Sequence, residues 1–207
     1  MFITFEGIEG CGKTTQARLL AEYLSQKGES VSITREPGWG ALGKLIRRMI
    51  LEEQNLDLHP LAELCLFCAD RAQHVKDYIK PKLDAGEIVI CDRYTDSTIV
   101  YQGYGRKLEL NFVRRLAAES AVNIKPNLTI LLNLPVRLAL SRLESRGKNT
   151  KIDHEPIEFH ESIRNGYMFL AENEPYRIKV VDADRGIEEI SEEINKLVDE
   201  FLSQKNP

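Results

Sequence analysis

The sequence predicts an α/β fold of three layers, with a five-stranded parallel sheet between two layers of helices. Five short apolar runs alternate along the chain with stretches of helical periodicity, which is the pattern of parallel sheets. A glycine-rich loop stands between the first apolar run and the first helical stretch. Because the 207 residues contain no repeats, linkers or low-complexity tracts, we expect one domain over residues 1–207.

Composition restricts the class of protein. The chain is 43% hydrophobic and 29% charged, which is ordinary for a soluble globular domain, and its formal net charge is −4. An acidic chain repels nucleic-acid phosphates overall, so we expect no nucleic-acid partner. No apolar run approaches the roughly 20 residues of a membrane span, and the first strand leaves no room for a targeting segment before it. We therefore expect a cytoplasmic protein without a membrane partner.

A phosphate-binding loop is predicted near the start of the chain. Residues 1–5 form an apolar run typical of a strand, and residues 15–27 have helical spacing. Residues 7–14 fit the pattern G-x-x-x-x-G-K-[ST] at every fixed position. Glycines let successive backbone N–H groups point at phosphate oxygens, and the helix N-terminus adds partial positive charge. This unit predicts the P-loop NTPase form of the three-layer fold.

Single side chains of this loop have predicted roles. Lys13 is long enough to reach the β and γ phosphates of a nucleotide, and the hydroxyl of Thr14 is a ligand for Mg²⁺. The residues predicted to contact the nucleotide here are Gly7, Ile8, Glu9, Gly10, Cys11, Gly12, Lys13, Thr14 and Thr15.

Charged residues follow the second predicted strand, which covers residues 29–34. The turn at 34–38 lies at the carboxyl end of that strand, where parallel sheets bind their ligands. The helix predicted over 39–53 carries Arg47, which is either a solvated helix charge or part of this ligand-binding edge.

Phe67 and Arg71 share one face of a helix predicted over residues 61–85, because they stand four positions apart. An aromatic ring with a guanidinium one turn away suits a planar, polar ligand such as a nucleobase. The spacing by itself favours the plainer alternative, a core phenylalanine beside a surface arginine.

A third buried strand is predicted over residues 87–91 and is followed by Asp92 and Arg93. A carboxylate that ends an apolar strand in a phosphate-loop protein is placed to face magnesium or to order water. The arginine beside it can neutralise phosphate charge. Further on, Thr98 and the segment 101–106 place polar and aromatic groups in a predicted helix and loop.

The segment 142–151 is basic, polar and glycine-containing. It is either a mobile lid that brings cations onto phosphates or a solvated surface loop. The other elements predicted after residue 106 are a helix over 109–122, a strand over 127–133, a helix that starts at Pro135, a helix over 157–173, a strand over 177–181 and a helix over 187–202.

Taken together, these motifs resemble the thymidylate kinase family of nucleoside monophosphate kinases, along essentially the whole chain. The segments that carry the resemblance, in family order, are residues 7–15, 34–38, 66–71, 92–94 and 101–103. The resemblance implies a sheet of order 2-3-1-4-5 and a homodimer. It also implies transfer of the γ-phosphate of ATP to dTMP with Mg²⁺, which yields ADP and dTDP on the way to dTTP.

The resemblance also implies roles for single residues. Thymine would stack on Phe67, would hydrogen-bond to Arg71 and would be lined by Thr98 and Gln102. Tyr101 would crowd the sugar 2′ position. Arg93 would hold the acceptor phosphate, and Pro37 would shape the acceptor pocket. Asp92 would order magnesium-bound water. Glu9 would face the sugar 3′-hydroxyl or the magnesium shell, and Arg142 would lie against adenine.

The predicted catalytic residues are Lys13, Asp92, Arg93 and a lid arginine. One family subclass carries an Asp-Arg pair where this chain has Glu9, so the charge-neutralising arginine should come from the lid at about 142–155, as in the bacterial subclass. Arg146 is our candidate, with Lys148 or Lys151 as alternatives.

The chain departs from the family pattern at two places. Trp39-Gly40 stands where Gly-Thr is common, and Asp153-His154-Glu155-Pro156 replaces Asp-Arg-x-Glu in the lid. The second departure exchanges a cation for a histidine that is mostly neutral at pH 7.

Other functions remain open to different degrees. A GTPase-type switch would need Asn-Lys-x-Asp and Asp-x-x-Gly motifs, which the sequence lacks. A related kinase that acts on dUMP or on a deoxynucleoside is the alternative within the enzymes, and a nucleotide-binding protein without catalysis is the alternative outside them.

Overall fold

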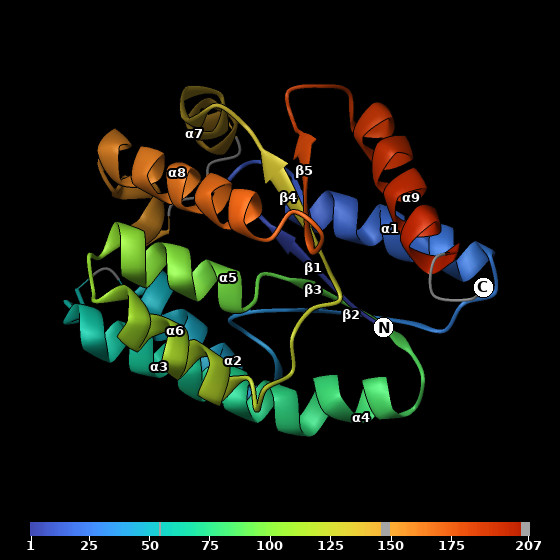
Figure 1. The fold of residues 1–207 in the computed structure, drawn as a ribbon. Helices are drawn as coiled ribbons and strands as arrows, with labels where there is room; N and C mark the ends of the chain where they lie inside the picture. The colour runs from blue at the N-terminus through green and yellow to red at the C-terminus, as the bar shows by residue number, and fades with distance from the viewer. Residues whose placement is uncertain (54, 146–149, 204–207) are drawn as a thin grey trace.

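The computed structural model describes residues 1–53, 55–145 and 150–203 (Figure 1). Within these residues, five strands form one sheet in which every neighbouring pair is parallel, in the order β2-β3-β1-β4-β5. The strands are β1 (Phe2–Glu6), β2 (Val31–Arg35), β3 (Ile88–Asp92), β4 (Leu128–Asn133) and β5 (Ile178–Asp182). The predicted three-layer fold and its strand order are confirmed.

The strands end with polar residues, and this shifts their boundaries from the predicted ones. We predicted that β1 and β3 end at Phe5 and Cys91, but the structure extends them to Glu6 and Asp92. Backbone pairing continues for one polar residue beyond each apolar run, and both of these polar residues are buried. Arg35 pairs in register with Asp92, so the polar ends of neighbouring strands meet at one edge of the sheet.

The helices cover both faces of the sheet (Figure 1). Helices α1 and α9 pack together on one face, whereas α3, α5, α6 and α8 lie on the other. The helices are α1 (Lys13–Gln26), α2 (Gly40–Arg47), α3 (Pro60–His74), α4 (Lys80–Asp84), α5 (Thr95–Thr98), α6 (Leu110–Ser120), α7 (Val136–Ser145), α8 (Ile157–Asn173) and α9 (Ile187–Ser203).

Wider π-helical turns extend three of these helices. They cover Arg48–Glu52 after α2, Val75–Ile79 between α3 and α4, and Ile99–Gly105 after α5. The long helices predicted over 39–53 and 61–85 are therefore continuous helical stretches. A short 3₁₀ turn, Lys151–His154, precedes α8. None of the helices in the described parts of the chain is both long enough and apolar enough to cross a membrane.

The side chains of β1 alternate between two environments. Ile3 and Phe5 belong to the large apolar cluster that includes Leu20 of α1, whereas Phe2 packs with Tyr94 in a second cluster. Glu6 is fully buried at the end of β1. A buried carboxylate is costly without hydrogen-bond partners, so Glu6 is bonded to polar groups near the carboxyl edge of the sheet.

Candidate active site

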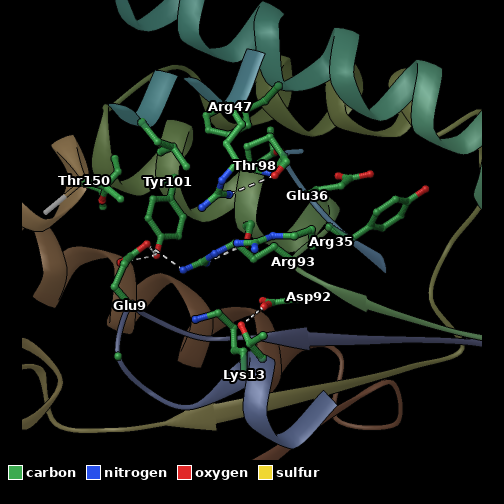
Figure 2. A pocket seen from close by; sticks show the side chains of 18 of the residues that line it. Glu9, Lys13, Arg35, Glu36, Arg47, Asp92, Arg93, Thr98, Tyr101 and Thr150 are labelled. Atoms are coloured by element: carbon green, nitrogen blue, oxygen red, sulfur yellow. Dashed lines mark hydrogen bonds and ion pairs between the residues drawn. The ribbon is translucent and has the colours of Figure 1, made fainter. Parts of the chain in front are cut away.

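A cavity of about 210 Å³ opens where β1, β2 and β3 end (Figure 2). It brings together residues that are far apart in the sequence. The predicted site residues that line it are Glu9, Gly10, Gly12, Lys13, Thr14, Thr15, Pro37, Phe67, Arg71, Asp92, Arg93, Thr98, Tyr101 and Gln102.

The phosphate loop has the backbone that its glycines predict. Gly7 and Gly10 adopt positive φ angles of 137° and 76°, and a Cβ at either position would lie 2.5 Å from a backbone carbonyl oxygen. Lys13 is buried, and its Nζ donates a hydrogen bond of 2.7 Å to the carbonyl of Ile8. The ammonium is therefore held over its own loop. Gly7, Ile8 and Cys11 shape the loop without lining the cavity.

Thr14 and Asp92 face each other at the mouth of the loop. The Thr14 hydroxyl donates a 2.5 Å hydrogen bond to Oδ2 of Asp92. A hydroxyl and a carboxylate are hard oxygen ligands, and Mg²⁺ takes one or two of these from a protein and the rest from phosphates and water. The described residues contain no group of three or more acidic, histidine or cysteine side chains for a metal. As two hard oxygen ligands, Thr14 and Asp92 fit a magnesium ion.

Arg93 joins the phosphate loop to the opposite wall. Its Nη1 donates to the carbonyl of Gly7 at 3.0 Å, to Ser97 at 3.1 Å and to Tyr167 at 3.2 Å, while Nη2 donates to Glu9 at 2.8 Å. Burial raises the pKa of Glu9, but the positive charges of Arg93 and Lys13 outweigh burial and hold that pKa below its usual value. Glu9 is therefore ionised at neutral pH and faces Arg93 rather than Thr14.

Three arginines are concentrated in one part of the cavity, and this charge suits an anion. Arg35, Arg47 and Arg93 all line it, and burial together with the like charges of Arg35 and Arg93 lowers the pKa of Arg47. Placing like charges close together is electrostatically unfavourable unless a bound anion offsets their repulsion. The sequence left Arg47 open between a solvated charge and the ligand edge, and the structure places it at the edge, with Nη1 3.1 Å from the carbonyl of Pro37.

The wall formed by α3 reverses one expectation. Spacing alone favoured a core phenylalanine beside a surface arginine, but Arg71 is only 2% exposed and Phe67 is half-buried in the cavity wall. Two contacts compensate the burial of the Arg71 guanidinium: its Nε donates to Glu36 at 2.9 Å, and its Cζ lies 5.1 Å from the ring centre of Tyr94. Neither partner is close to Arg71 in sequence, so no local pattern indicates the burial.

Tyr101 and Gln102 complete this wall. The Tyr101 hydroxyl donates to both carboxylate oxygens of Glu9, at 2.7 and 2.8 Å. Gln102 donates through Nε2 to Glu63 at 2.9 Å, which orients its amide. Thr98 is 2% exposed one turn before Gln102. All three side chains come from α5 and the π-helical segment that follows it, which the sequence described only as a helix and loop.

Several lining residues were not in the predicted set of site residues, although some of them belong to the turn at 34–38 or to the predicted lid, and Arg47 had been left open. They are Arg35, Glu36, Arg47, Leu51, Tyr94, Ser97, Leu143, Thr150, Ile152 and Asp153. Thr150 and Asp153 form a capping box at the start of the 3₁₀ turn, with the Thr150 N–H 2.6 Å from Oδ2 of Asp153. The Thr-x-x-Asp spacing was a readable signal for this turn. Glu36 carried no such signal, because its partners come from α3.

The structure describes only part of the predicted lid. Arg146 and Lys148 lie outside the described residues. Arg142 is apart from the cavity lining and donates to the carbonyl of Ala183 at 3.3 Å, beside the loop after β5. Lys151 donates to the carbonyl of Leu56. Arg142 still lies at the carboxyl edge of the sheet. Its side chain can therefore flank a ligand that extends past the phosphate loop.

Comparison with known proteins assigns the family. The model of the thymidylate kinase family matches residues 5–194. The chain belongs to the thymidylate kinase family.

Thymidylate kinases from bacteria are similar to it over nearly their full length. The thymidylate kinase of Desulfovibrio desulfuricans is 43% identical over 99% of this chain and 98% of that protein. The thymidylate kinase of Syntrophotalea carbinolica is 46% identical over 93% of this chain and 92% of its own length. A crystal structure of the thymidylate kinase from Ehrlichia chaffeensis superposes with a TM-score of 0.78 at 35% identity and covers 96% of this chain and 98% of the other.

Proposed function

We propose that this protein is an ATP-dependent thymidylate kinase that transfers the γ-phosphate of ATP to dTMP and releases dTDP and ADP, a step toward dTTP. Membership of the family supports the reaction. The observation in the molecule that supports it best is one cavity in which a phosphate loop faces a wall that combines Phe67 with the buried Arg71. One side suits a nucleoside triphosphate, and the other suits a flat base.

The donor would bind along the loop that joins β1 to α1. Backbone N–H groups of residues 7–15 would receive the phosphates, and Lys13 would exchange the carbonyl of Ile8 for phosphate oxygens. Thr14 and Asp92, the latter through water, would hold Mg²⁺, which neutralises charge on the β and γ phosphates when bound. Arg142 would flank the adenine.

The acceptor would bind on the opposite side. Thymine would stack on Phe67, would accept a hydrogen bond from Arg71, and would be lined by Thr98 and Gln102. Tyr101 would lie where a ribose 2′-hydroxyl would have to fit, which favours deoxyribose. In addition, Pro37 would bound the pocket, and Glu9 would meet the sugar 3′-hydroxyl or the magnesium shell.

Charge compensation would carry the chemistry. Arg93, with Arg35 and Arg47 beside it, would hold the acceptor phosphate in line with the donor, and Lys13 would neutralise charge on the transferred group. The attacking group is already a phosphate anion, so no strong general base is needed. Arg146 would bring a further positive charge when a lid over about 142–155 closes on the single domain.

We also propose a cytoplasmic homodimer. Leu42, Leu45 and Met49 on α2 and its extension, Leu61 on α3 and Phe112 on α6 are exposed large hydrophobic side chains. The three helices lie side by side in Figure 1. A second copy of the chain would cover this apolar face, and sedimentation at micromolar concentration tests it by giving twice the chain mass of 23.6 kDa.

An acceptor panel tests the proposed reaction. The enzyme is incubated with ATP, Mg²⁺ and one nucleoside monophosphate at a time, and the nucleotides are separated and quantified. We expect dTDP and ADP in equal amounts from dTMP. Faster turnover of dUMP or another acceptor would retain the kinase and reject the substrate. ATP binding without turnover of any acceptor would reject the kinase.

A further inference from the structure

Arg71 ends a chain of buried hydrogen bonds that begins at the sheet. Thr34 and Nε2 of His74 are 2.7 Å apart, Nδ1 of His74 is 2.9 Å from Oε1 of Glu36, and Nε of Arg71 is 2.9 Å from Oε2 of Glu36. All four side chains are buried, and His74 is 0% exposed. Each oxygen of the Glu36 carboxylate therefore has one partner, which fixes the plane of the carboxylate.

The elements that supply these groups explain why they meet. His74 and Arg71 are three residues apart on α3 and share one face of it. Thr34 lies in β2, and Glu36 stands in the turn directly after that strand. The chain of bonds thus ties the helix that carries the base-binding wall to the edge of the sheet.

Two aromatic rings hold His74 in place. Its ring is stacked with Trp39 at 5.4 Å and 21° and with Tyr78 at 5.9 Å and 20°, and Trp39 and Tyr78 are 5.1 Å apart. Two hydrogen bonds and two ring contacts leave the imidazole one orientation. Trp39 is the residue at which this chain departs from the common Gly-Thr of the family, and it connects the turn that carries Glu36 to His74.

Part of the Arg71 guanidinium remains for a ligand. Nη1 is buried and has no hydrogen-bond partner among the described residues, although Arg71 lines the cavity. A buried donor without a partner is costly, so it is expected to meet an acceptor when the cavity is filled. Nε is held by Glu36, and this sets where Nη1 points.

The direction of the hydrogen bonds defines what His74 does. A carboxylate only accepts, so Nδ1 of His74 carries the proton toward Glu36, and a neutral ring accepts from the Thr34 hydroxyl at Nε2. Without that donor, the Oε1 atom of Glu36 would be buried and unsatisfied. Glu36 would then turn toward another donor, and the Arg71 guanidinium, which Glu36 holds through Nε, would turn with it and lose its orientation toward the ligand.

We propose that His74 is a positioning residue for acceptor selection, which holds Glu36 so that the guanidinium of Arg71 stays oriented toward a carbonyl on the acceptor base. The inference rests on the proposed function, because it assigns the base to Arg71. It extends that function by naming the residue that orients Arg71. Trp39 and Thr34 contribute because they hold the His74 ring in place.

Matched variants separate this role from a general effect on the fold. His74→Phe keeps a stacked ring and removes both hydrogen bonds. His74→Asn restores a donor toward Glu36 at the place of Nδ1. Lys196→Ala, an exposed helix position, is the neutral control. Each variant is assayed with saturating ATP and Mg²⁺ on dTMP and on 5-methyl-dCMP, which keeps the methyl group and replaces the 4-carbonyl by an amine.

For His74→Phe we expect a KM for dTMP about tenfold higher, with kcat and the KM for ATP within about twofold of the parent. The preference for dTMP over 5-methyl-dCMP in kcat/KM should fall by about the same factor, and His74→Asn should recover most of it. A purely structural role would lower the melting temperature without a selective change in this preference.

Two results would overturn the inference. One is an unchanged KM and base preference in folded His74→Phe. The other is an equal loss on both acceptors that His74→Asn does not rescue. If His74→Phe does not fold, Thr34→Val removes only the far end of the bond chain and should raise the KM for dTMP about threefold. Failure of the parent enzyme on dTMP would reject the proposed function instead, and the variants are then compared on the acceptor it prefers.

Discussion

The two sides of the cavity are built in different ways. Apart from Asp92, the phosphate side consists of consecutive residues, and Lys13, Thr14 and the backbone of the loop need little beyond the motif itself. The acceptor side takes Phe67 and Arg71 from α3 and other groups from β2, β3 and the segment after α5. In Figure 2, Lys13 and Asp92 lie on one side of Arg93, whereas Arg47 and Thr98 lie on the other.

The comparison shows that one side of a ligand site can be determined by residues that are neighbours in the sequence, while the other side is determined by residues far apart in it. The phosphate side depends on backbone conformation, which neighbouring residues determine. The acceptor side depends on burial of charge, which only distant partners allow. Variants should therefore separate the two sides into an effect on turnover and an effect on acceptor affinity.

The largest effect is expected on the phosphate side. Lys13→Ala removes the ammonium that compensates charge in the transition state, and kcat should fall on the order of a thousandfold. Steady-state kinetics with both substrates varied measure it, with Lys196→Ala as a control. A loss that appears only in the KM for dTMP would show that Lys13 serves the acceptor side.

Arg93 should affect both sides, because it contacts Gly7 of the loop and Glu9 beside Tyr101. For Arg93→Lys we expect kcat/KM for dTMP about a hundredfold lower, since a single ammonium cannot replace a guanidinium that makes four hydrogen bonds. The same kinetics give kcat and KM separately. A change in one constant alone would assign Arg93 to one side only.

Phe67 should affect the acceptor side alone. Loss of a stacked base costs about 1–3 kcal/mol, so Phe67→Ala should raise the KM for dTMP about tenfold or more while kcat and the KM for ATP change little. Phe67→Leu keeps an apolar side chain without an aromatic face and should recover only part of the affinity. Equal KM values in the parent and Phe67→Ala would remove Phe67 from the base site.

The last effect concerns the stability of the fold rather than catalysis, and it depends on Glu6 at the end of β1. Burial, and after it the negative charge of Asp96, raises the pKa of Glu6 from its ordinary 4.5 to about 7. The folded protein therefore holds a proton between these values that the unfolded chain has released. This contribution to stability is present at low pH and is lost as pH rises toward 7, by up to about 1.4 kcal/mol for each pH unit.

Glu6→Gln removes that titration. Its melting temperature should fall less than that of the parent as pH is raised from 5 to 7.5, even though the variant is less stable overall, because it disturbs bonds to Ser97 and Tyr167. Thermal unfolding at several pH values measures the difference in slope. Parallel curves for the two proteins would show that Glu6 titrates at its ordinary pKa.

The same contrast explains what the sequence could predict. Alternating apolar runs and helical stretches predicted the parallel sheet, and a motif of eight residues predicted the phosphate loop. Arg71 was assigned to a base only through resemblance to a family, because its spacing favoured the surface. Its partner Glu36 is 35 residues away, and no local pattern indicates a contact at that distance. The polar ends of the strands were missed for a related reason, since pairing there does not require apolar side chains.

Calorimetric titration of dTMP tests the separation of the two sides most directly. The parent, Lys13→Ala and Phe67→Ala are titrated without ATP. We predict a dissociation constant within about twofold of the parent for Lys13→Ala and at least about tenfold weaker for Phe67→Ala. Loss of dTMP binding in Lys13→Ala, or its retention in Phe67→Ala, would contradict the division of the cavity into a phosphate side and an acceptor side.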